Sequence, residues 1–424
     1  MNDNIATPFA KPLYVMLKPA GAHCNLDCKY CYYLEKNNLY NTSQRHLMTD
    51  EMLEQFTREY IEAQTMPQVL FTWHGGEPLM RSIDFYKKAL ELQKKYAHGK
   101  QIDNVIQTNG TLLTDEWCEF FAQNHFLVGI SIDGPQEYHD HYRQTSAGKP
   151  SWEKVMHGIH LLKKHRVEWN AMAVVNAYNA EHPLEFYHFF RDNGCQYLQF
   201  TPIVERLTEH EDGRTLASLA DVSHEDNYED VGNAKKQKEN QKITIADFSV
   251  TSEQWGKFLC TIFDDWVRHD VGKIFVEIFD CTLANWVGVQ PGICAYSKEC
   301  GHAGVMEHNG DVFSCDHFVF PEYKLGNIQD KSLIDMLYGE KQQAFSRLKH
   351  TSLPRQCKEC DMEFACHGEC PKNRFENDKY GEPGLNYLCK GYYEYYTHVA
   401  PYMDFMKREL QAQRPPANIM NVLK

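Results

Sequence analysis

Three cysteines near the N-terminus are spaced closely enough to bind a single metal centre. Cys24, Cys28 and Cys31 follow the pattern C-x3-C-x2-C, in a predicted loop after a short apolar stretch. An iron–sulfur cube usually takes four protein ligands, so three thiolates would leave one iron open to bind something else. Catalytic metal sites keep a free position for the same reason. The alternative interpretation is a zinc site or a structural cluster with a remote fourth cysteine.

A second group of cysteines lies in the C-terminal third of the chain. Its eight members, enough for two fully ligated 4Fe–4S clusters, are Cys294, Cys300, Cys315, Cys357, Cys360, Cys366, Cys370 and Cys389. Zinc sites with four cysteines also use C-x2-C pairs, so two structural zinc sites are the alternative. The other cysteines are most simply small buried apolar residues. They are Cys118, Cys195, Cys260 and Cys281.

Short apolar stretches alternate with helical segments through the first half of the chain. The predicted strands are 13–18, 68–73, 103–107, 127–132, 170–175 and 197–201. Helices are predicted after Thr49 and after Thr114, because acidic residues follow each and complement the helix dipole. Further helices are predicted over 82–98, 151–165, 183–193 and 252–269. Six βα units in series imply a parallel sheet or an open barrel, so we expect an α/β fold with a partial (β/α)6 barrel.

Polar and glycine-rich sequences follow the carboxyl ends of the predicted strands. These sequences are 24–31, 74–78, 107–110, 131–135 and 201–204. In parallel β/α architectures this is where ligands bind. Gly75 and Gly76 carry no Cβ, so the backbone there can approach a ligand closely. Gly-Gly-Glu-Pro alone is usually a plain turn, but its place after a strand and a three-cysteine loop favours a binding site.

Composition divides the chain into parts. Residues 1–250 form the predicted barrel, with a polar stretch over 205–248 that we expect to be a surface insertion or, alternatively, a lid. Residues 251–280 are a predicted helical connection. Residues 281–395 are rich in cysteine and glycine, which predicts a small domain held by metal centres rather than by a core. Residues 396–424 are predicted to be a helical tail.

Charge and hydropathy exclude several classes of partner. The formal net charge of −14 argues against nucleic acid, because phosphate binding needs a basic surface. No stretch approaches the ~18 apolar residues of a transmembrane helix. Residues 1–8 lack the basic start and apolar stretch of a signal peptide. We therefore expect a cytoplasmic protein with no membrane or nucleic-acid partner, whose reduced cysteines act as ligands or redox groups.

The sequence around the first cysteines resembles a known family. Residues Lys18–Leu34 read KPAGAHCNLDCKYCYYL, which resembles the opening of radical S-adenosylmethionine enzymes and, within them, the anaerobic sulfatase-maturating enzymes. The resemblance covers nearly the whole chain except 205–248. It implies that the open iron chelates the amino and carboxylate groups of S-adenosylmethionine, and that the reduced cluster cleaves the sulfonium to a 5′-deoxyadenosyl radical.

The same resemblance implies contacts for this cofactor. The edge at 75–78 would bind the methionine amino group, and Ser131 and Arg143 would contact the ribose and the carboxylate. A planar guanidinium suits a carboxylate because it can bind both oxygens, although a surface salt bridge is the alternative for Arg143. Tyr30 and the backbone near Val204 would contact the adenine. The implied contact residues are Tyr30, Gly75, Gly76, Glu77, Ser131, Arg143 and Val204.

The C-terminal cysteines resemble the family's twin-cluster domain, called SPASM. The match assigns four of them to an auxiliary cluster nearer the active site, namely Cys294, Cys300, Cys315 and Cys370. It assigns the other four to an outer cluster, namely Cys357, Cys360, Cys366 and Cys389. Together with the N-terminal site, the resemblance implies three 4Fe–4S clusters.

Asp316 directly follows Cys315, and the resemblance makes it the proton acceptor. Oxidising a Cys or Ser side chain to an aldehyde or thioaldehyde removes a hydrogen atom from Cβ, a proton from the heteroatom and an electron. A positioned carboxylate can take the proton. Without the resemblance, an Asp beside a Cys is usually a capping or turn residue, and His317 is a rival base.

The resemblance implies oxidation of a Cys or Ser to Cα-formylglycine. The expected substrate is an unfolded sulfatase chain carrying Cys or Ser followed by x-Pro-x-Arg, and a protein such as flavodoxin or ferredoxin is the expected reductant. The first alternative is another twin-cluster enzyme that forms thioether or carbon–carbon crosslinks in peptides. The second is a non-enzymatic electron-transfer scaffold or zinc-stabilised binding module, which leaves the glycine-rich loops unexplained.

Overall fold

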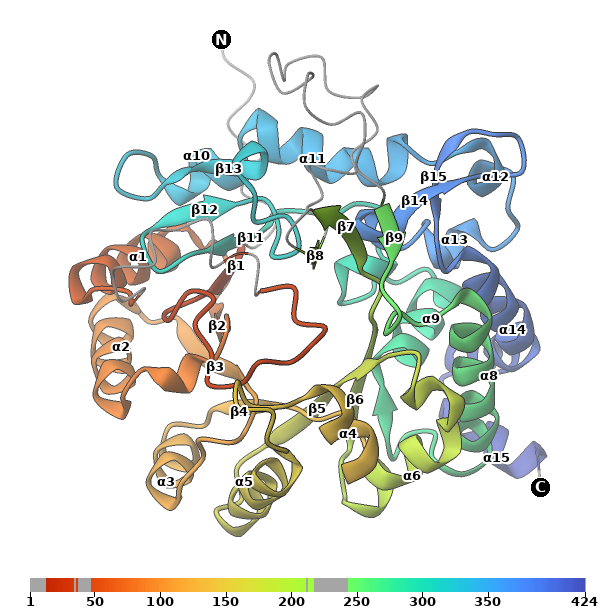
Figure 1. The fold of residues 1–424 in the computed structure, drawn as a ribbon, viewed down its shortest axis with the longest axis horizontal. Helices are drawn as coiled ribbons and strands as arrows, with labels where there is room; N and C mark the ends of the chain where they lie inside the picture. The colour runs from red at the N-terminus through yellow and green to blue at the C-terminus, as the bar shows by residue number, and fades with distance from the viewer. Residues whose placement is uncertain (1–12, 34–35, 37–46, 211–212, 217–242, 424) are drawn as a thin grey trace. The chain divides into compact units, whose positions relative to one another are not determined.

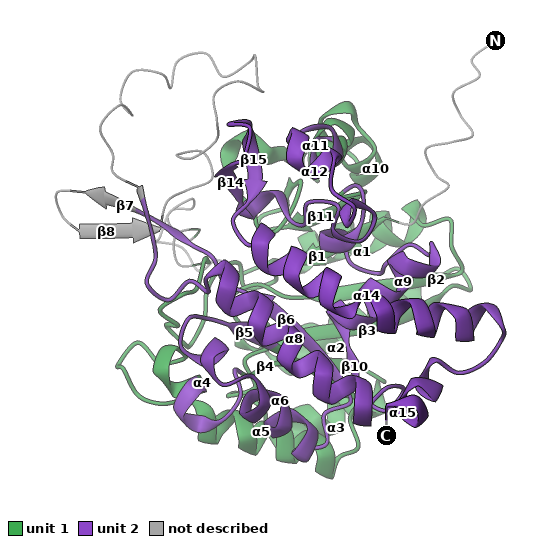
Figure 2. Cartoon of the chain, turned by 90° about the vertical axis from the view of Figure 1, so that its right-hand side faces the viewer, with its two compact units in different colours: residues 1–132, 139–172, 300–347 green, residues 133–138, 173–299, 348–424 purple. Residues whose placement is uncertain are grey.

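The chain divides into two compact units, shown in different colours in Figure 2. Unit 1 comprises residues 1–132, 139–172 and 300–347, and unit 2 comprises residues 133–138, 173–299 and 348–424. The computed structural model describes residues 13–33, 36, 47–210, 213–216 and 243–423. The N-terminal residues that argue against a signal peptide, and Leu34 of the quoted motif, lie outside the described residues.

The strands of unit 1 follow the order β5-β4-β3-β2-β1-β11-β12-β13. Their bounds are β1 Tyr14–Leu17, β2 Gln68–Trp73, β3 Gln101–Thr108, β4 Leu127–Ser131, β5 Trp169–Val175, β11 Ala303–Met306, β12 Asp311–Phe313 and β13 Lys324–Asn327. Pairing is parallel from β5 to β11 and antiparallel from β11 to β13. The first five predicted strands are therefore confirmed, and the parallel pairing of β1 with β11 was not predicted.

The helices of unit 1 begin where the sequence indicates. Their bounds include α1 Asp50–Ala63, α2 Ile83–Tyr96, α3 Asp115–Gln123, α5 Trp152–Lys164 and α10 Leu333–Leu337. The Thr49 and Thr114 side chains cap α1 and α3 by accepting from backbone N–H groups in the first turn. Figure 1 shows α1, α2, α3 and α5 on the outer side of the strands, with the loop after β1 on the inner side.

In unit 2, strand β6 (Tyr197–Pro202) lies between the last residues of β5 and the short parallel strand β10 (Phe275–Val276). The sixth predicted strand is therefore confirmed, whereas β10 was not predicted. Within the described residues the strand order has different strands at its two ends, so the sheet is open. This agrees with the expected α/β fold and an incomplete barrel.

The helices of unit 2 include the predicted segments at 183–193, 252–269 and the C-terminal tail. Their bounds are α4 Gln136–Tyr142 (which continues into unit 1), α6 Pro183–Asp192, α8 Ser252–His269, α9 Glu277–Val287, α14 Cys389–Gln411 and α15 Ile419–Val422. A capping box at Thr251 and Gln254 starts α8. Helix α14 packs on α8 at a close approach of Gly391, whose added Cβ would lie 2.0 Å from the Ser252 carbonyl oxygen.

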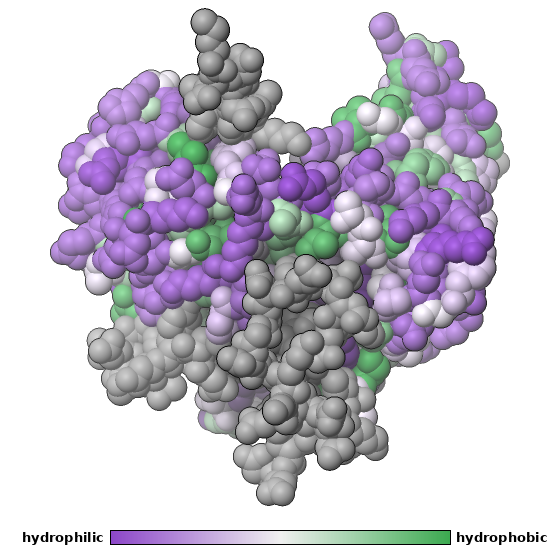
Figure 3. All heavy atoms as spheres, turned by 90° about the horizontal axis from the view of Figure 1, so that it is seen from above, coloured by the Kyte–Doolittle hydropathy of each residue, from purple (hydrophilic) through white to green (hydrophobic). Residues whose placement is uncertain are grey.

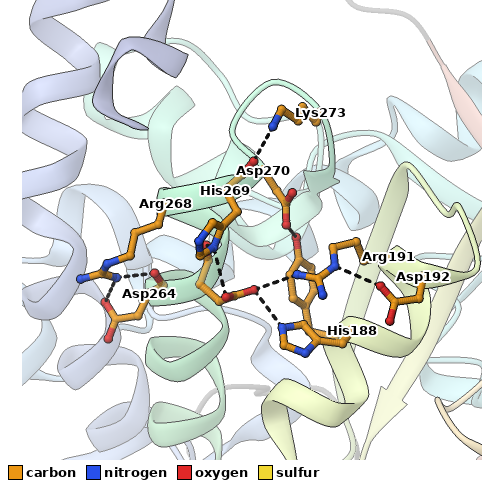
Figure 4. A network of polar contacts seen from close by, with 10 residues as sticks. His188, Arg191, Asp192, Asp264, Arg268, His269, Asp270 and Lys273 are labelled. Atoms are coloured by element: carbon orange, nitrogen blue, oxygen red, sulfur yellow. Dashed lines mark hydrogen bonds and ion pairs between the residues drawn. The ribbon is translucent and has the colours of Figure 1, made fainter. Parts of the chain in front are cut away.

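A network of charged side chains joins α6 to α8 (Figure 4). Asp265 pairs with His188 at 3.0 Å and with Arg191 at 3.4 Å, and Tyr187 donates to Asp270 at 2.8 Å. Ion pairs that are partly exposed to solvent contribute about 0–1 kcal/mol each. The network therefore orients the two helices more than it stabilises them.

The polar stretch 205–248 contains regular structure at both ends. Strand β7 (Arg206–His210) pairs antiparallel with β8 (Gly213–Leu216) and with β9 (Ile243–Ile245). Residues 211–212 and 217–242 of this stretch lie outside the described residues. The composition that indicated a polar insertion gave no sign of these strands.

The cysteine-rich segments of unit 2 form short elements with few buried apolar side chains. The elements are η5 Cys294–Tyr296, α12 Arg355–Lys358, α13 Glu363–Cys366, η7 Pro371–Asn373, β14 Arg374–Asn377 and β15 Pro383–Asn386. Between residues 348 and 388 the buried aliphatic side chains are Leu353, Ala365 and Leu388. Such a segment has too little buried apolar surface to hold its conformation by a core alone.

The surface shown in Figure 3 is mostly hydrophilic, with apolar residues in small separate patches. Such a surface is ordinary for a globular protein, in which scattered exposed apolar residues need no partner. Among the described residues, no helix combines the length and apolar character that a membrane span requires.

Candidate active site

Two glycines hold the cysteine loop, residues 18–33, against the end of β2. The Gly76 N–H donates to the Gly21 carbonyl at 2.9 Å, and the Glu77 N–H donates to the His23 carbonyl at 2.8 Å. A Cβ on Gly76 would lie 2.3 Å from the His23 carbonyl oxygen, and one on Gly75 would lie 2.6 Å from the Gly21 oxygen. These glycines therefore allow the backbone after β2 to pack closely against the cysteine loop. The sequence had suggested a close approach to a ligand, and this packing is a second role for the same residues.

The three thiols of the loop influence one another. Burial raises the pKa of Cys24 to about 12, and the nearby Glu77 and Cys28 add to the rise. Burial likewise raises the pKa of Cys31 to about 11, with a further contribution from Cys24, whereas Arg143 opposes it. Thiolates in this place need positive charge close by, and a metal centre bound to them would provide it.

The three thiols of the cysteine loop are compatible with the predicted iron–sulfur cube. Among the described residues, no set of three His, Cys, Asp or Glu side chains converges tightly enough to hold one metal ion. In an iron–sulfur cube each thiolate binds a different iron, so the sulfur atoms need not converge on one point. All fifteen cysteines lie in the described part of the chain, and none of them forms a disulfide there.

Glu77 is a structural link in this loop. Its fully buried carboxylate accepts from the Leu79 N–H at 2.9 Å, the Asn109 N–H at 2.7 Å and the Thr108 hydroxyl at 2.8 Å. Burial nevertheless raises the pKa of Glu77 to about 7. The Glu77 carboxylate is thus engaged within unit 1, and the predicted cofactor contact at Glu77 stays a prediction.

Unit 1 also brings Ser131, Arg143 and Tyr30 to this region. The Ser131 hydroxyl accepts from the Gln107 amide at 3.0 Å at the carboxyl end of β4. Arg143 is buried, lies 5.6 Å from the centre of the Tyr30 ring, and is close enough to Cys31 to lower its pKa. A surface salt bridge is thus the wrong interpretation of Arg143, because the side chain is not on the surface.

Val204 belongs to unit 2 and follows β6. It is buried, and its carbonyl accepts from the Lys372 ammonium at 3.3 Å. Its predicted contact with the adenine stays a prediction, as do the other cofactor contacts.

Asp316 is surrounded by donors from the cysteine loop and from Lys36, all in unit 1. The Lys18 ammonium forms an ion pair with Oδ1 at 2.5 Å, and the Tyr32 and Tyr33 hydroxyls donate to Oδ2 at 2.6 Å and 2.5 Å. The Lys36 ammonium donates to the backbone carbonyl of Asp316. Both carboxylate oxygens are therefore oriented, which is uncommon for a plain turn residue.

The charges around Asp316 keep it ionised. Burial alone would raise the pKa of this carboxyl, but Lys18 and then Lys36 hold it well below its usual range. An ionised carboxylate can accept a proton, as the predicted role requires. The rival base, His317, makes an edge-to-face contact with the Tyr32 ring, with 5.4 Å between the ring centres.

Sequence reasoning missed the residues that surround the predicted site. Glu307 at the end of β11 pairs with Lys18 at 2.9 Å, and both side chains are buried. The Asn109 amide donates to the Cys24 sulfur at 3.6 Å. Asn109 lies in one of the polar sequences after the strands, so that pattern was a usable signal. Nothing in the local sequence marks Glu307.

The four cysteines assigned to the outer cluster are near one another in unit 2. Burial raises the pKa of Cys389 to about 12, and Cys357 and Cys360 contribute to the rise. The pKa of Cys366 is also raised by burial, with contributions from Cys389 and Cys357. These couplings support the assignment of the set, which stays a prediction.

The other auxiliary set is divided between the units. Cys300 and Cys315 belong to unit 1, and Cys294 and Cys370 belong to unit 2, so their joint ligation also stays a prediction. The remaining cysteines behave largely as expected. Cys118, Cys195 and Cys281 are buried, whereas Cys260 is partly exposed.

Comparison with known proteins agrees with this arrangement. The sequence model of the radical SAM superfamily matches residues 19–190, and that of the iron–sulfur cluster-binding domain SPASM matches residues 299–361. The fold is similar to the solved structure of anSMEcpe with bound AdoMet and Cp18Cys peptide, with a TM-score of 0.77 and 28% identity over 94% of this chain and 100% of that one.

Two curated relatives match nearly end to end. The chain is 66% identical over 424 residues to a serine-type anaerobic sulfatase-maturating enzyme of Bacteroides thetaiotaomicron, covering 100% of this chain and 98% of the relative. It is 30% identical over 393 residues to a cysteine-type enzyme of Clostridium perfringens, covering 92% and 97%. The chain therefore belongs to the anaerobic sulfatase-maturating enzymes, which are radical S-adenosylmethionine enzymes with a SPASM domain.

Proposed function

We propose that this enzyme oxidises a serine of a sulfatase polypeptide to Cα-formylglycine, with Asp316 as the proton acceptor. The observation that carries the proposal is the carboxylate of Asp316, which follows a predicted cluster ligand and is held by Lys18, Tyr32 and Tyr33. A group fixed at both oxygens can meet a substrate hydroxyl in one defined direction, which general base catalysis requires.

The reaction must remove a hydrogen atom, a proton and an electron from the serine side chain. When bound, S-adenosylmethionine and its cluster would supply the acceptor for a hydrogen atom of Cβ, and an auxiliary cluster would supply the acceptor for the electron. Asp316 takes the hydroxyl proton, and Lys18 balances the carboxylate charge before this transfer. The product is an aldehyde, and no water is consumed when the substrate is serine.

The residues that would hold these groups are the eleven predicted cysteine ligands and the predicted contact residues after the carboxyl ends of the strands. Cys24, Cys28 and Cys31 would ligate the cluster that binds S-adenosylmethionine. Arg143, which lies near Cys31, would bind the carboxylate of the cofactor, and Ser131 its ribose. With two auxiliary clusters, the holoenzyme would contain three 4Fe–4S clusters.

Serine is the proposed target because of the pattern of relatives. At about 30% identity the relatives are named serine-type or cysteine-type, whereas the relative at 66% identity is serine-type. We further propose that the substrate is an unfolded sulfatase chain with Ser-x-Pro-x-Arg, that flavodoxin or ferredoxin delivers electrons, and that the reaction takes place in the cytoplasm.

The test is a peptide assay with the reduced holoenzyme. A Ser-x-Pro-x-Arg peptide should lose two hydrogens by mass spectrometry and then react with a hydrazide probe, because the product is an aldehyde. A thioether or carbon–carbon crosslink also loses two hydrogens but does not react with hydrazide. Mass loss without hydrazide labelling would therefore replace our proposal by the crosslinking alternative.

Asp316→Asn separates radical formation from proton removal. The variant should still release 5′-deoxyadenosine but form at least tenfold less aldehyde, consistent with the ~10²–10⁴-fold typical of general acid–base groups. His317→Gln is the matched control for the rival base and should retain aldehyde formation. If His317→Gln lost aldehyde formation and Asp316→Asn retained it, His317 would be the proton acceptor instead of Asp316.

A further inference from the structure

Lys349 is a buried lysine whose ammonium group donates hydrogen bonds to the backbone around Cys294. Its side chain is inaccessible to solvent, and its ammonium donates to the carbonyls of Cys294, of Ala295 at 2.6 Å and of Ser297 at 2.5 Å. Desolvation raises the pKa of the Cys294 thiol, and the Lys349 ammonium opposes this rise. A fixed positive charge thus lies beside one predicted ligand of the auxiliary cluster nearer the active site.

Arg374 places a second cation near Cys366 and Cys370, one predicted ligand from each auxiliary set. Its guanidinium donates to the Gly368 carbonyl at 2.8 Å, the His367 carbonyl at 2.7 Å and the Glu369 carbonyl at 2.8 Å, all within the short loop between Cys366 and Cys370. Burial lowers the pKa of Arg374, and the charges of the two cysteines oppose that change. The cation is therefore close to ligands of both auxiliary clusters.

Glu369 is the opposing charge in the same place. Its side chain is buried and accepts from the Asn386 amide at 3.1 Å. Burial raises the pKa of Glu369, and Lys349 is among the groups that counteract the rise. The carboxylate also raises the pKa of the Cys294 thiol, in the opposite sense to Lys349. Cys294 therefore has a buried ammonium group and a buried carboxyl group near it, and the two act on its pKa in opposite directions.

We propose that Lys349, Arg374 and Glu369 set the reduction potentials of the auxiliary clusters, the two cations raising them and the carboxylate lowering them. Reduction adds negative charge to a cluster, so a nearby cation favours the reduced form and a nearby anion disfavours it. Charges act strongly here because the surroundings are poor in water and weakly polarisable. The inference rests on the ligand assignment of the proposed function.

A purely structural role is the competing explanation. Lysines also cap backbone carbonyls far from any cysteine, as Lys100 does in unit 1, where it donates to the carbonyls of Ile61 at 2.5 Å and Gln64 at 2.7 Å. If Lys349 and Arg374 were only such caps, replacing them would weaken the local fold without moving a potential in a charge-dependent direction.

The experiment is a redox titration of the reconstituted full-length protein, followed by electron paramagnetic resonance. The background variant Cys24→Ala/Cys28→Ala/Cys31→Ala removes the signal of the N-terminal cluster. In this background Lys349→Gln and Arg374→Gln should each lower the midpoint potential of an auxiliary cluster, and Glu369→Gln should raise it. Arg374→Lys, which keeps the charge, and Lys100→Gln should leave the potentials near those of the background.

Opposite shifts for Lys349→Gln and Glu369→Gln are the decisive result, because loosened packing does not depend on the sign of the lost charge. Unchanged potentials, shifts in the same direction, or loss of both auxiliary clusters in all three charge-removing variants would overturn the inference. The titration uses neither substrate nor S-adenosylmethionine. A wild-type enzyme that makes no aldehyde would therefore refute the proposed function while leaving this measurement intact.

Discussion

At the scale of single residues, Lys18 is the charge on which the proposed base depends. It is inaccessible to solvent and pairs with both Glu307 and Asp316. The sequence placed Lys18 in the family motif and Asp316 beside a ligand, but it could not show that they touch. Their contact depends on the pairing of strands far apart in the chain, whereas the spacing of Cys24, Cys28 and Cys31 is local and could be read directly.

Lys18→Met should destabilise unit 1 strongly. The substitution keeps an apolar stem of similar length but leaves the buried Glu307 carboxylate and the partly buried Asp316 carboxylate without their direct ion-pair partner. Removing one partner of a buried ion pair typically costs about 3–5 kcal/mol. Urea unfolding of the anaerobically purified protein, followed by circular dichroism, should show the loss.

Lys87→Met is the matched control for that measurement. Lys87 pairs with Asp84 at 3.1 Å, and both side chains are well exposed. Exposed pairs contribute about 0–1 kcal/mol, so this variant should unfold nearly as the wild type does. Equal free energies of unfolding for the two variants would show that the ion pairs of Lys18 do not stabilise unit 1 as expected.

At the scale of elements, the sequence predicted what is local and missed what is distant. Six strands and their intervening helices were found because apolar periodicity and capping residues act over a few positions. The parallel pairing of strand β11 with β1 was not foreseen. Register between remote segments is decided by packing of the whole sheet, which no local pattern records.

Gly76→Ala should displace the cysteine loop. The new Cβ would meet the backbone of Ala22 and His23 at 2.3–2.5 Å, and backbone cannot rotate away as a side chain can. We expect loss of S-adenosylmethionine binding and of about four of about twelve iron atoms, since the auxiliary ligands are untouched. Iron analysis and equilibrium dialysis measure the two effects.

Gly292→Ala is the control for the glycine experiment. A Cβ at Gly292 meets nothing within 4 Å, and the backbone there is not in the left-handed region. Iron content and cofactor binding should therefore match the wild type. A Gly76→Ala enzyme that keeps its full iron content and binds the cofactor normally would contradict the close packing of loop and strand.

At the scale of the whole molecule, the two units should respond differently to loss of metal. Residues 348–388 have few buried aliphatic side chains, whereas the strands of unit 1 are buried by surrounding helices. Chelation of iron should therefore speed hydrogen–deuterium exchange across 355–389 while β2 to β4 stay protected. Equal exchange protection of residues 355–389 with and without iron would show that this segment keeps its conformation without the metal.

The pairing of β1 with β11 also bears on how the protein is made. Lys18 and Glu307 are separated by 289 residues, so the ribosome must add that length of chain before the first strand meets this neighbour. At about 5–20 residues per second, the delay is roughly 15–60 s. During that time one edge of β1 has no partner and Lys18 has no carboxylate from the β11–β12 segment. The contacts of Lys18 with Glu307 and Asp316 can therefore form only after residues 307–316 have been made.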